Sequence, residues 1–159
     1  YTFEGEPAGM GKISYLLPKE DTIYEFAYNS ETHQTTVTEL EPDQVVELPG
    51  PTVYGDFSSW IFEGGDSVLL EDEDGDGIYT GTLELPAYTG TDKGYMLAVA
   101  LSKKLYDDEY GIRWGVEEQY TFEGEPAGMG GVSYLKPEKD TTYLLSYDSK
   151  THVTTVEEK

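Results

Sequence analysis

The chain has 159 residues, of which 32 are acidic and 10 basic, so its formal net charge at neutral pH is −22. A field of this sign repels nucleic acid and anionic membrane surfaces, and we expect neither as a partner. Cysteine is absent, which excludes disulfides, and the hydrophobic content of 37% argues against disorder. No apolar run is long enough to insert into a membrane.

The first forty residues return at the end of the chain. Residues 1–40 align with residues 120–159 at an offset of 119, and about 26 of the 40 pairs are identical. Internal repeats are typical of modular arrays. We therefore interpret residues 1–40 as the C-terminal strands of a preceding repeat and residues 41–159 as one complete module. The first segment would lack strand partners, and we expect the mate repeat or another chain to cover its open edge, with strand exchange between chains as one route.

β-branched and aromatic residues alternate with polar ones through most of the chain, which predicts strands and few helices. In the first copy, Lys12–Leu17 is a predicted strand closed by Pro18. Residues 23–28 and 33–40 then predict a hairpin. Glu41–Pro51 reads as a linker, with Val45–Leu48 as an alternative edge strand.

The second module repeats this pattern with further short strands separated by turn signals. We expect strands at Thr52–Phe57, Ser67–Leu70, Ile78–Leu85, Gly94–Leu101 and Gly131–Lys136, followed by a closing hairpin over residues 141–159. This spacing favours an all-β fold, an immunoglobulin-like antiparallel β-sandwich. Tyr106–Gly131 shows no clean period and predicts a long irregular loop, a common location for function.

An acidic turn precedes one of these strands. Asp72, Asp74 and Asp76 match positions one, three and five of a calcium-binding loop, but position twelve, which needs an acid, is Leu83. The half-motif favours a tight acidic turn feeding a strand. Weak calcium binding by another geometry stays open, and we expect no other cofactor.

Catalytic groupings are not evident. His33 and His152 occupy equivalent positions of the repeat, without a nucleophile and carboxylate set around them, so we predict a structural role. Carboxylates are abundant, but no pair is singled out as the acids of a glycoside hydrolase would be. The sequence therefore favours a protein that is not an enzyme.

Aromatic residues are the positive signal, with fourteen tyrosines and two tryptophans. Flat rings stack on the C–H face of sugars, and neighbouring polar groups bind the hydroxyls. Trp60 follows a predicted strand in a glycine-rich context, where a ligand platform and a core position are equally plausible. Trp114 lies in the predicted loop, which favours exposure.

The order of five short motifs resembles a known family. TVYGDFSSW from Thr52, then DGDGIYTGTLELPAYTGTDKGYMLAVAL from Asp74, then YDDEYG from Tyr106 resemble the starch-associated β-sandwich modules called X25, found in pullulanases and amylopullulanases. The tail THVTTV from Thr151 resembles their last strands. The resemblance covers about 110 residues and half-covers the first forty. The pattern is also similar to CBM48-type glycogen-binding modules and to SusE/SusF-type surface starch binders.

The resemblance implies a role for Trp60. In the glycogen-binding type, a Trp shortly after the G-x-F strand stacks on glucose, and Trp60 occupies that place. Leu105 or Tyr106 stands where the second Trp of that platform would be, and Met96 and Ala98 lie near the place of its usual Lys. These departures leave room for a different site built on Tyr106–Gly131.

The resemblance thus implies a non-catalytic module that binds starch-like α-1,4-glucans, such as maltooligosaccharides or amylopectin, in a secreted or cell-surface bacterial protein. We expect rings to stack on glucose and polar groups to bind hydroxyls. The rings are Trp60, Trp114, Tyr120, Phe122 and Tyr106, and the polar groups are Lys103, Lys104, Arg113 and Glu117. Tyr1 and Phe3 repeat Tyr120 and Phe122, so the two copies either line one groove or cap the sandwich ends. The alternatives are a structural spacer without a ligand and an acidic face for a basic protein partner.

Overall fold

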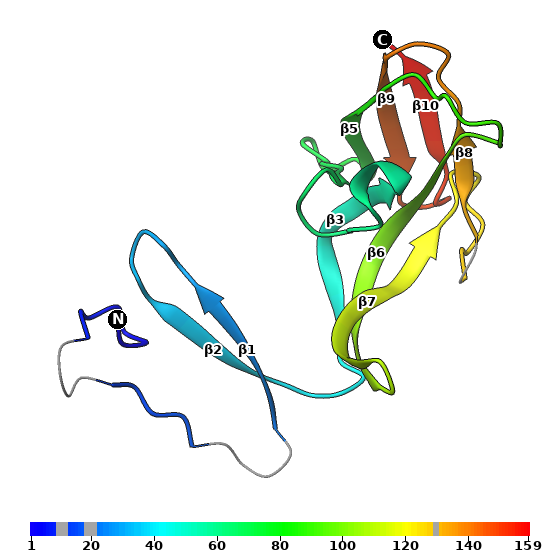
Figure 1. The fold of residues 1–159 in the computed structure, drawn as a ribbon. Coiled ribbons are helices and arrows are strands. Elements are labelled where there is room, and N and C mark those ends of the chain that lie inside the picture. Colours follow the sequence, from blue (N-terminus) through cyan, green and yellow to red (C-terminus); the bar gives the residue numbers. More distant parts are fainter. Residues whose placement is uncertain (9–12, 18–21, 129–130) are drawn as a thin grey trace. The chain divides into compact units, whose positions relative to one another are not determined.

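The computed structural model describes residues 1–8, 13–17, 22–128 and 131–159, which form two compact units (Figure 1). Unit 1 comprises Tyr1–Gln44 and Leu105–Arg113, and unit 2 comprises Val45–Lys104 and Trp114–Lys159. Apart from one short 3-10 helix, η1 (Asp56–Ser58), the regular structure of the described residues is β-strand. The prediction of an all-β fold is therefore confirmed.

Two antiparallel sheets carry unit 2. The five-stranded sheet has the order β4-β3-β6-β7, with β8 pairing β6. Its strands are β3 (Val45–Gly55), β4 (Val68–Leu69), β6 (Tyr95–Asp108), β7 (Gly111–Tyr120) and β8 (Ser133–Leu135), of which β6 and β7 run on into unit 1. The three-stranded sheet has the order β10-β9-β5 and is built from β5 (Ile78–Leu85), β9 (Thr141–Asp148) and β10 (Thr154–Glu158).

The main core of unit 2 lies between these sheets. On β9, alternate residues are buried, because successive side chains of a strand point to opposite faces. Tyr143 and Leu145 from β9 pack in one cluster with Val53, Leu97 and Val99 of the other sheet. Full burial of each such side chain contributes roughly 1.5–3 kcal/mol. The two sheets thus form a β-sandwich; the immunoglobulin-like description of it remains a prediction.

A smaller apolar cluster uses the opposite face of β3 and β6. Tyr54, Ala98 and Ala100 alternate with the residues that face the main core, so both faces of these strands are buried. Phe62 and Val116 pack against this cluster. The chain between η1 and β4 therefore covers the outer face of the sheet, and this position is where the candidate site arises.

The prediction of a long irregular loop over Tyr106–Gly131 is wrong up to Tyr120, whereas residues 121–128 are irregular as expected. Strand β6 continues to Asp108, and β7 follows from Gly111 to Tyr120. The turn between them uses Gly111 at a φ of 93°, which favours glycine. In β7, Ile112, Trp114 and Val116 alternate with polar residues or glycine, a period of two that the charged neighbours obscured.

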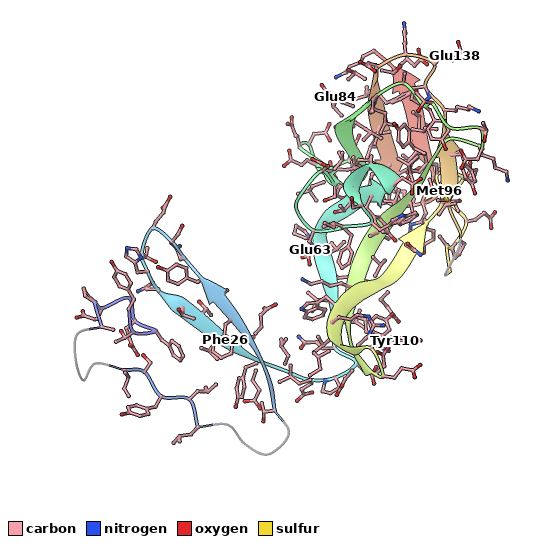
Figure 2. All side chains as sticks on the ribbon, in the orientation of Figure 1. Phe26, Glu63, Glu84, Met96, Tyr110 and Glu138 are labelled. Carbon is pink, nitrogen blue, oxygen red and sulfur yellow. The ribbon has the colours of Figure 1, made fainter. Side chains whose placement is uncertain are left out.

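Unit 1 contains a hairpin of β1 (Ile23–Tyr28) and β2 (Thr35–Leu40), so each copy of the repeat ends in the predicted hairpin. Phe26 and Tyr28 on β1 are 54% and 56% exposed. Figure 2 labels Phe26 on this hairpin. Among the described residues β1 pairs with β2 alone, so the mate repeat of the same chain does not pair with this edge, and its cover by another chain stays a prediction. At the equivalent edge of the second copy, β9 pairs with β5. The described part of the chain contains one such strand, and β9 already pairs with it.

Two features of the first copy and of the segment after it differ from the prediction. Residues 13–17 form no strand, whereas their counterparts in the second copy include β8. Lys12 and Pro18, the predicted limits of that strand, lie outside the described residues. The predicted linker is also shorter than expected, because β3 begins at Val45. This start agrees with the alternative prediction of an edge strand over Val45–Leu48.

Candidate functional site

The backbone that presents Trp60 is strained. Ser59 and Trp60 follow η1 with φ values of 53° and 62°, a region that bulky residues rarely adopt. Hydrogen bonds hold this turn, since the Trp60 amide donates to the Gly55 carbonyl at 2.8 Å and the Ile61 amide donates to that of Ser58 at 3.0 Å. Such strain persists only where the surroundings fix it, and it is frequent at functional sites.

The indole of Trp60 is held in place while part of it faces solvent. Its Nε1 donates to Asp56 Oδ1 at 3.1 Å, and the other carboxylate oxygen of Asp56 accepts from the Met96 amide at 3.0 Å. The ring meets Tyr54 edge to face at a centroid distance of 5.7 Å. Trp60 nevertheless remains 42% exposed, so the turn offers a rigid aromatic surface.

A buried tyrosine supports this ring. Tyr54 is 6% exposed, and its ring packs edge to face on Phe62 at 6.2 Å. Its hydroxyl donates to Gln119 Oε1. Burial raises the pKa of Tyr54 to about 12, so the phenol stays neutral under Trp60 at physiological pH.

Trp114 lies on β7, and an ammonium group covers its ring. Lys103 Nζ is 4.7 Å from the Trp114 ring centroid and 2.7 Å from Glu63 Oε2. Because Glu63 follows Trp60 by three residues, this ion pair ties the Trp60 turn to β6; Figure 2 labels Glu63 beside β3. We call the resulting group the Trp60–Trp114 surface. It comprises Tyr54, Trp60, Phe62, Glu63, Lys103 and Trp114.

The tip of the β6–β7 hairpin belongs to unit 1 and forms its own cluster. The guanidinium of Arg113 donates to both carboxylate oxygens of Asp108 and lies 5.5 Å from the Tyr106 ring and 5.6 Å from that of Tyr110. The Arg113 hydrogen bond holds the pKa of Asp108 below its usual value. Neighbouring side chains of a strand point to opposite faces, so Arg113 does not extend the surface around Trp114.

The prediction that Phe122 stacks on a sugar is wrong. Its side chain is 6% exposed and belongs to the main core. Its backbone is anchored on both sides, since its amide donates to Ser133 Oγ at 2.8 Å and its carbonyl accepts from the Thr154 amide at 2.8 Å. An aromatic residue in an irregular segment had suggested exposure, but the segment docks on the closing hairpin.

Tyr120 is engaged within the protein as well. Its ring stacks on His152 at a centroid distance of 3.9 Å, and its hydroxyl donates to Glu118 at 2.8 Å. His152 also lies 2.6 Å from the Tyr147 hydroxyl through Nδ1. The histidine thus has the packing partners expected of a structural residue.

The first copy repeats these contacts inside unit 1. Tyr1 stacks on His33 at 3.9 Å, and His33 Nδ1 lies 2.6 Å from the Tyr28 hydroxyl. Phe3 is half-buried, 6.1 Å from the ring of Phe26. Each copy of the repeated string therefore packs on its own hairpin, which favours the capping alternative over a shared groove.

The remaining predicted hydroxyl ligands lie on the long strands. Glu117 is exposed on β7, and Lys104 is half-buried on β6, where it pairs with Val45 of β3. Of the predicted residues, Lys103 and Trp114 are in contact, and Trp60 is linked to them through the ion pair of Lys103 with Glu63. Sequence reasoning missed Tyr54, Phe62 and Glu63. The last two follow Trp60 by two and three residues, and this short spacing was a signal, because residues of one turn lie close to one another.

The acidic turn is organised by its own backbone. The carboxylate oxygens of Asp72, Asp74 and Asp76 lie within 4.8 Å of one another. Asp72 accepts from the Gly75 amide at 2.8 Å, and Asp76 accepts from the Ile78 amide at 2.7 Å. Leu83, at the place of the bidentate acid, is buried in the core. These contacts fit the interpretation as a turn, and calcium binding stays a prediction.

Comparison of the chain with protein-family models, with curated proteins and with solved structures finds no match. Within the described residues, none of the helical structure has the length and apolar character that crossing a bilayer requires.

Proposed function

We propose that the Trp60–Trp114 surface binds starch-like α-1,4-glucans, such as maltooligosaccharides or amylopectin, without catalysis. The observation that supports this proposal most is the exposed indole of Trp60, which lies on a strained turn, donates to Asp56 and packs on Tyr54. A ring held in this way loses little conformational freedom on binding, so contact with a ligand costs less entropy.

The chemistry of the surface suits a neutral sugar. The exposed part of Trp60 offers an apolar plane to the C–H face of a glucose ring, while Lys103 and Glu63 offer a donor and acceptors to hydroxyls. An uncharged ligand also avoids the repulsion that a net charge of −22 imposes on anions. In this proposal the chain is an immunoglobulin-like module of a secreted or cell-surface bacterial protein, and repetition of modules raises avidity.

Calorimetry with maltoheptaose tests the proposal. Trp60→Ala and Trp114→Ala each remove a ring, and we expect each to weaken binding tenfold or more, which is about 1.4 kcal/mol. The matched control is Tyr134→Ala, since Tyr134 is an exposed ring of unit 2 that also lies under a lysine, Lys93, at 5.1 Å. Unchanged affinity in both tryptophan variants would exclude this surface as the site.

A second candidate is a structural spacer without a ligand. It is favoured by the internal engagement of side chains predicted to meet sugar, because Phe122 is buried, Tyr120 stacks on His152 and Arg113 is bound to Asp108. A pull-down on insoluble starch separates the two functions. A binding module is recovered with the granules, whereas a spacer stays in the supernatant.

A further inference from the structure

The hairpin of unit 1 lacks a strand partner that its counterpart has. In unit 2, β9 pairs with β10 on one edge and with β5 on the other, from Ile78 opposite Asp148 to Leu85 opposite Thr141. Strand β1, the counterpart of β9, pairs with β2 alone in the part of the chain that the structure describes. The edge of β1 that corresponds to the β5 side of β9 therefore has no strand beside it there.

The face of this hairpin that corresponds to the core is uncovered too. Leu145 and Tyr147 of β9 are 0% and 1% exposed, whereas Phe26 and Tyr28 at the same repeat positions are more than half exposed. Tyr24 stands at the place of the buried Tyr143. An apolar face of this kind is stable when a second sheet packs on it, as it does in unit 2.

The hairpin and the segment that packs on it nevertheless repeat the same local contacts in the two copies. The amide of Phe3 donates to Ser14 Oγ at 2.7 Å, as that of Phe122 does to Ser133 at 2.8 Å. His33 and His152 have φ values of 59° and 60°. The first copy is thus already shaped to receive the partner that the second copy has.

The covalent connection is too short for residues 1–40 to take the place of residues 120–159 beside β5 of their own chain. In unit 2, Lys159 follows β10, and its amide donates to the Thr142 carbonyl. At the same end of the sandwich, the ring of Tyr88, just beyond β5, lies 5.0 Å from the ring of Tyr95, the first residue of β6. Val45, the first residue of β3, pairs with Lys104. Lys104 lies nine residues after Tyr95 on β6 and is therefore about 30 Å from that end of the sandwich.

The connector is too short to cover that distance. If residues 1–40 replaced residues 120–159, Leu40 would stand at the place of Lys159 and would have to join Val45 within five residues. Five extended residues span at most about 18 Å. A second copy of the chain does not supply an unpaired β5 either. It contains two copies of the repeated segment (residues 1–40 and 120–159) but one domain of the type of residues 41–119, and the β5 of that domain is already paired.

We propose that the β1 edge and the face of Tyr24, Phe26 and Tyr28 bind a separate β-sheet domain of the same type as residues 41–119. That domain lacks a segment of the type of residues 120–159, so its β5-type strand is unpaired. The β5-type strand of that domain pairs antiparallel with β1 in the register of unit 2. Thr82 then lies opposite Glu25, because Thr82 pairs with Leu144 and Glu25 is the counterpart of Leu144.

Disulfide trapping in a lengthened chain tests this pairing. Residues 41–119 are added before Tyr1 of the full chain, with Glu25→Cys and with Thr82→Cys in the added segment. The natural chain has no cysteine, so a disulfide reports this pair alone. We expect an intramolecular disulfide, together with slow amide exchange along both edges of β1. Phe26→Asp in the same protein should abolish the disulfide.

Two variants of the natural chain serve as controls. Thr82→Cys with Leu144→Cys is expected to form an intramolecular disulfide, because these residues face each other in unit 2. Thr82→Cys with Glu25→Cys should form none within one chain, because the connector is too short. Failure of the lengthened chain to cross-link while the first control succeeds overturns the proposal, and so does cross-linking in the second control.

A peptide probe keeps the proposal testable if the lengthened chain does not fold. A peptide with the sequence of residues 77–86, carrying cysteine in place of Thr82, is mixed with the natural chain bearing Glu25→Cys. We expect at least fivefold more mixed disulfide than with a scrambled peptide. Equal trapping of the two peptides overturns the proposed register.

Discussion

Tyr54 links the candidate site to the packing of the sheet at the scale of a single residue. Its ring supports Trp60 and Phe62, its hydroxyl donates to Gln119, and burial raises its pKa to about 12. The sequence predicted the strand that carries Tyr54 but not this role. Alternation of side chains assigns it to a face of the sheet, whereas the loop that buries that face is set by tertiary packing.

Ionisation of Tyr54 should couple stability to alkaline pH. Below pH 10, near the pKa of an unfolded tyrosine, the phenol is neutral in both states and its contribution is fully present. Between pH 10 and about 12 the unfolded chain ionises first, so the free energy of unfolding falls. Urea unfolding at pH 9 and pH 11 should show this fall, and Tyr54→Phe should reduce it. Tyr110→Phe, which alters an exposed ring, should leave the fall unchanged; equal slopes in all three proteins would contradict the assignment.

The two copies of the repeat show at the scale of an element how context decides burial. Strands β1 and β9 stand at equivalent positions of the repeat and each pairs with the strand that follows it, β2 or β10, but only β9 has β5 on its second edge. Periodicity predicted both hairpins and the bounds of β5, because alternation is a local property. It missed β7, where glycine and charged residues interrupt the apolar pattern, and it misplaced Phe122, because docking of an irregular segment leaves no periodic signal.

Equivalent substitutions in β1 and β9 should therefore differ in cost. Leu145→Ala opens a cavity in the main core and is expected to lower the free energy of unfolding by about 2–5 kcal/mol. Phe26→Ala removes a larger side chain from an exposed face and should change it by no more than about 0.5 kcal/mol. Chemical denaturation followed by far-UV circular dichroism measures both. A larger loss for Phe26→Ala would mean that its face is covered in solution.

At the scale of the whole molecule, the excess of acidic side chains opposes the compact state. A net charge of −22 on 159 residues creates repulsion that folding increases, because it brings like charges closer. Composition alone revealed this property. The residues that gather on one surface could not be read from it, since acidic residues occur along the entire chain.

Salt should accordingly stabilise the protein. Raising NaCl from about 0.01 M to about 0.15 M shortens the Debye length from about 30 Å to about 8 Å, which screens the repulsion between distant carboxylates. We expect the midpoint of thermal unfolding, measured by calorimetry, to rise by several degrees. Sucrose at matched osmolality serves as the uncharged control and should have a much smaller effect. A midpoint that is constant or falls with salt would show that local ion pairs, such as that of Lys103 with Glu63, outweigh the net charge.

The unlike surroundings of the two indoles give the protein a pair of built-in optical reporters. Trp60 touches solvent, whereas Trp114 is half-buried beneath an ammonium group, so their emission spectra should differ and respond separately to a solute. Replacing one indole by phenylalanine leaves the other as a single fluorophore. Each half of the surface can then be titrated by light, without any attached dye.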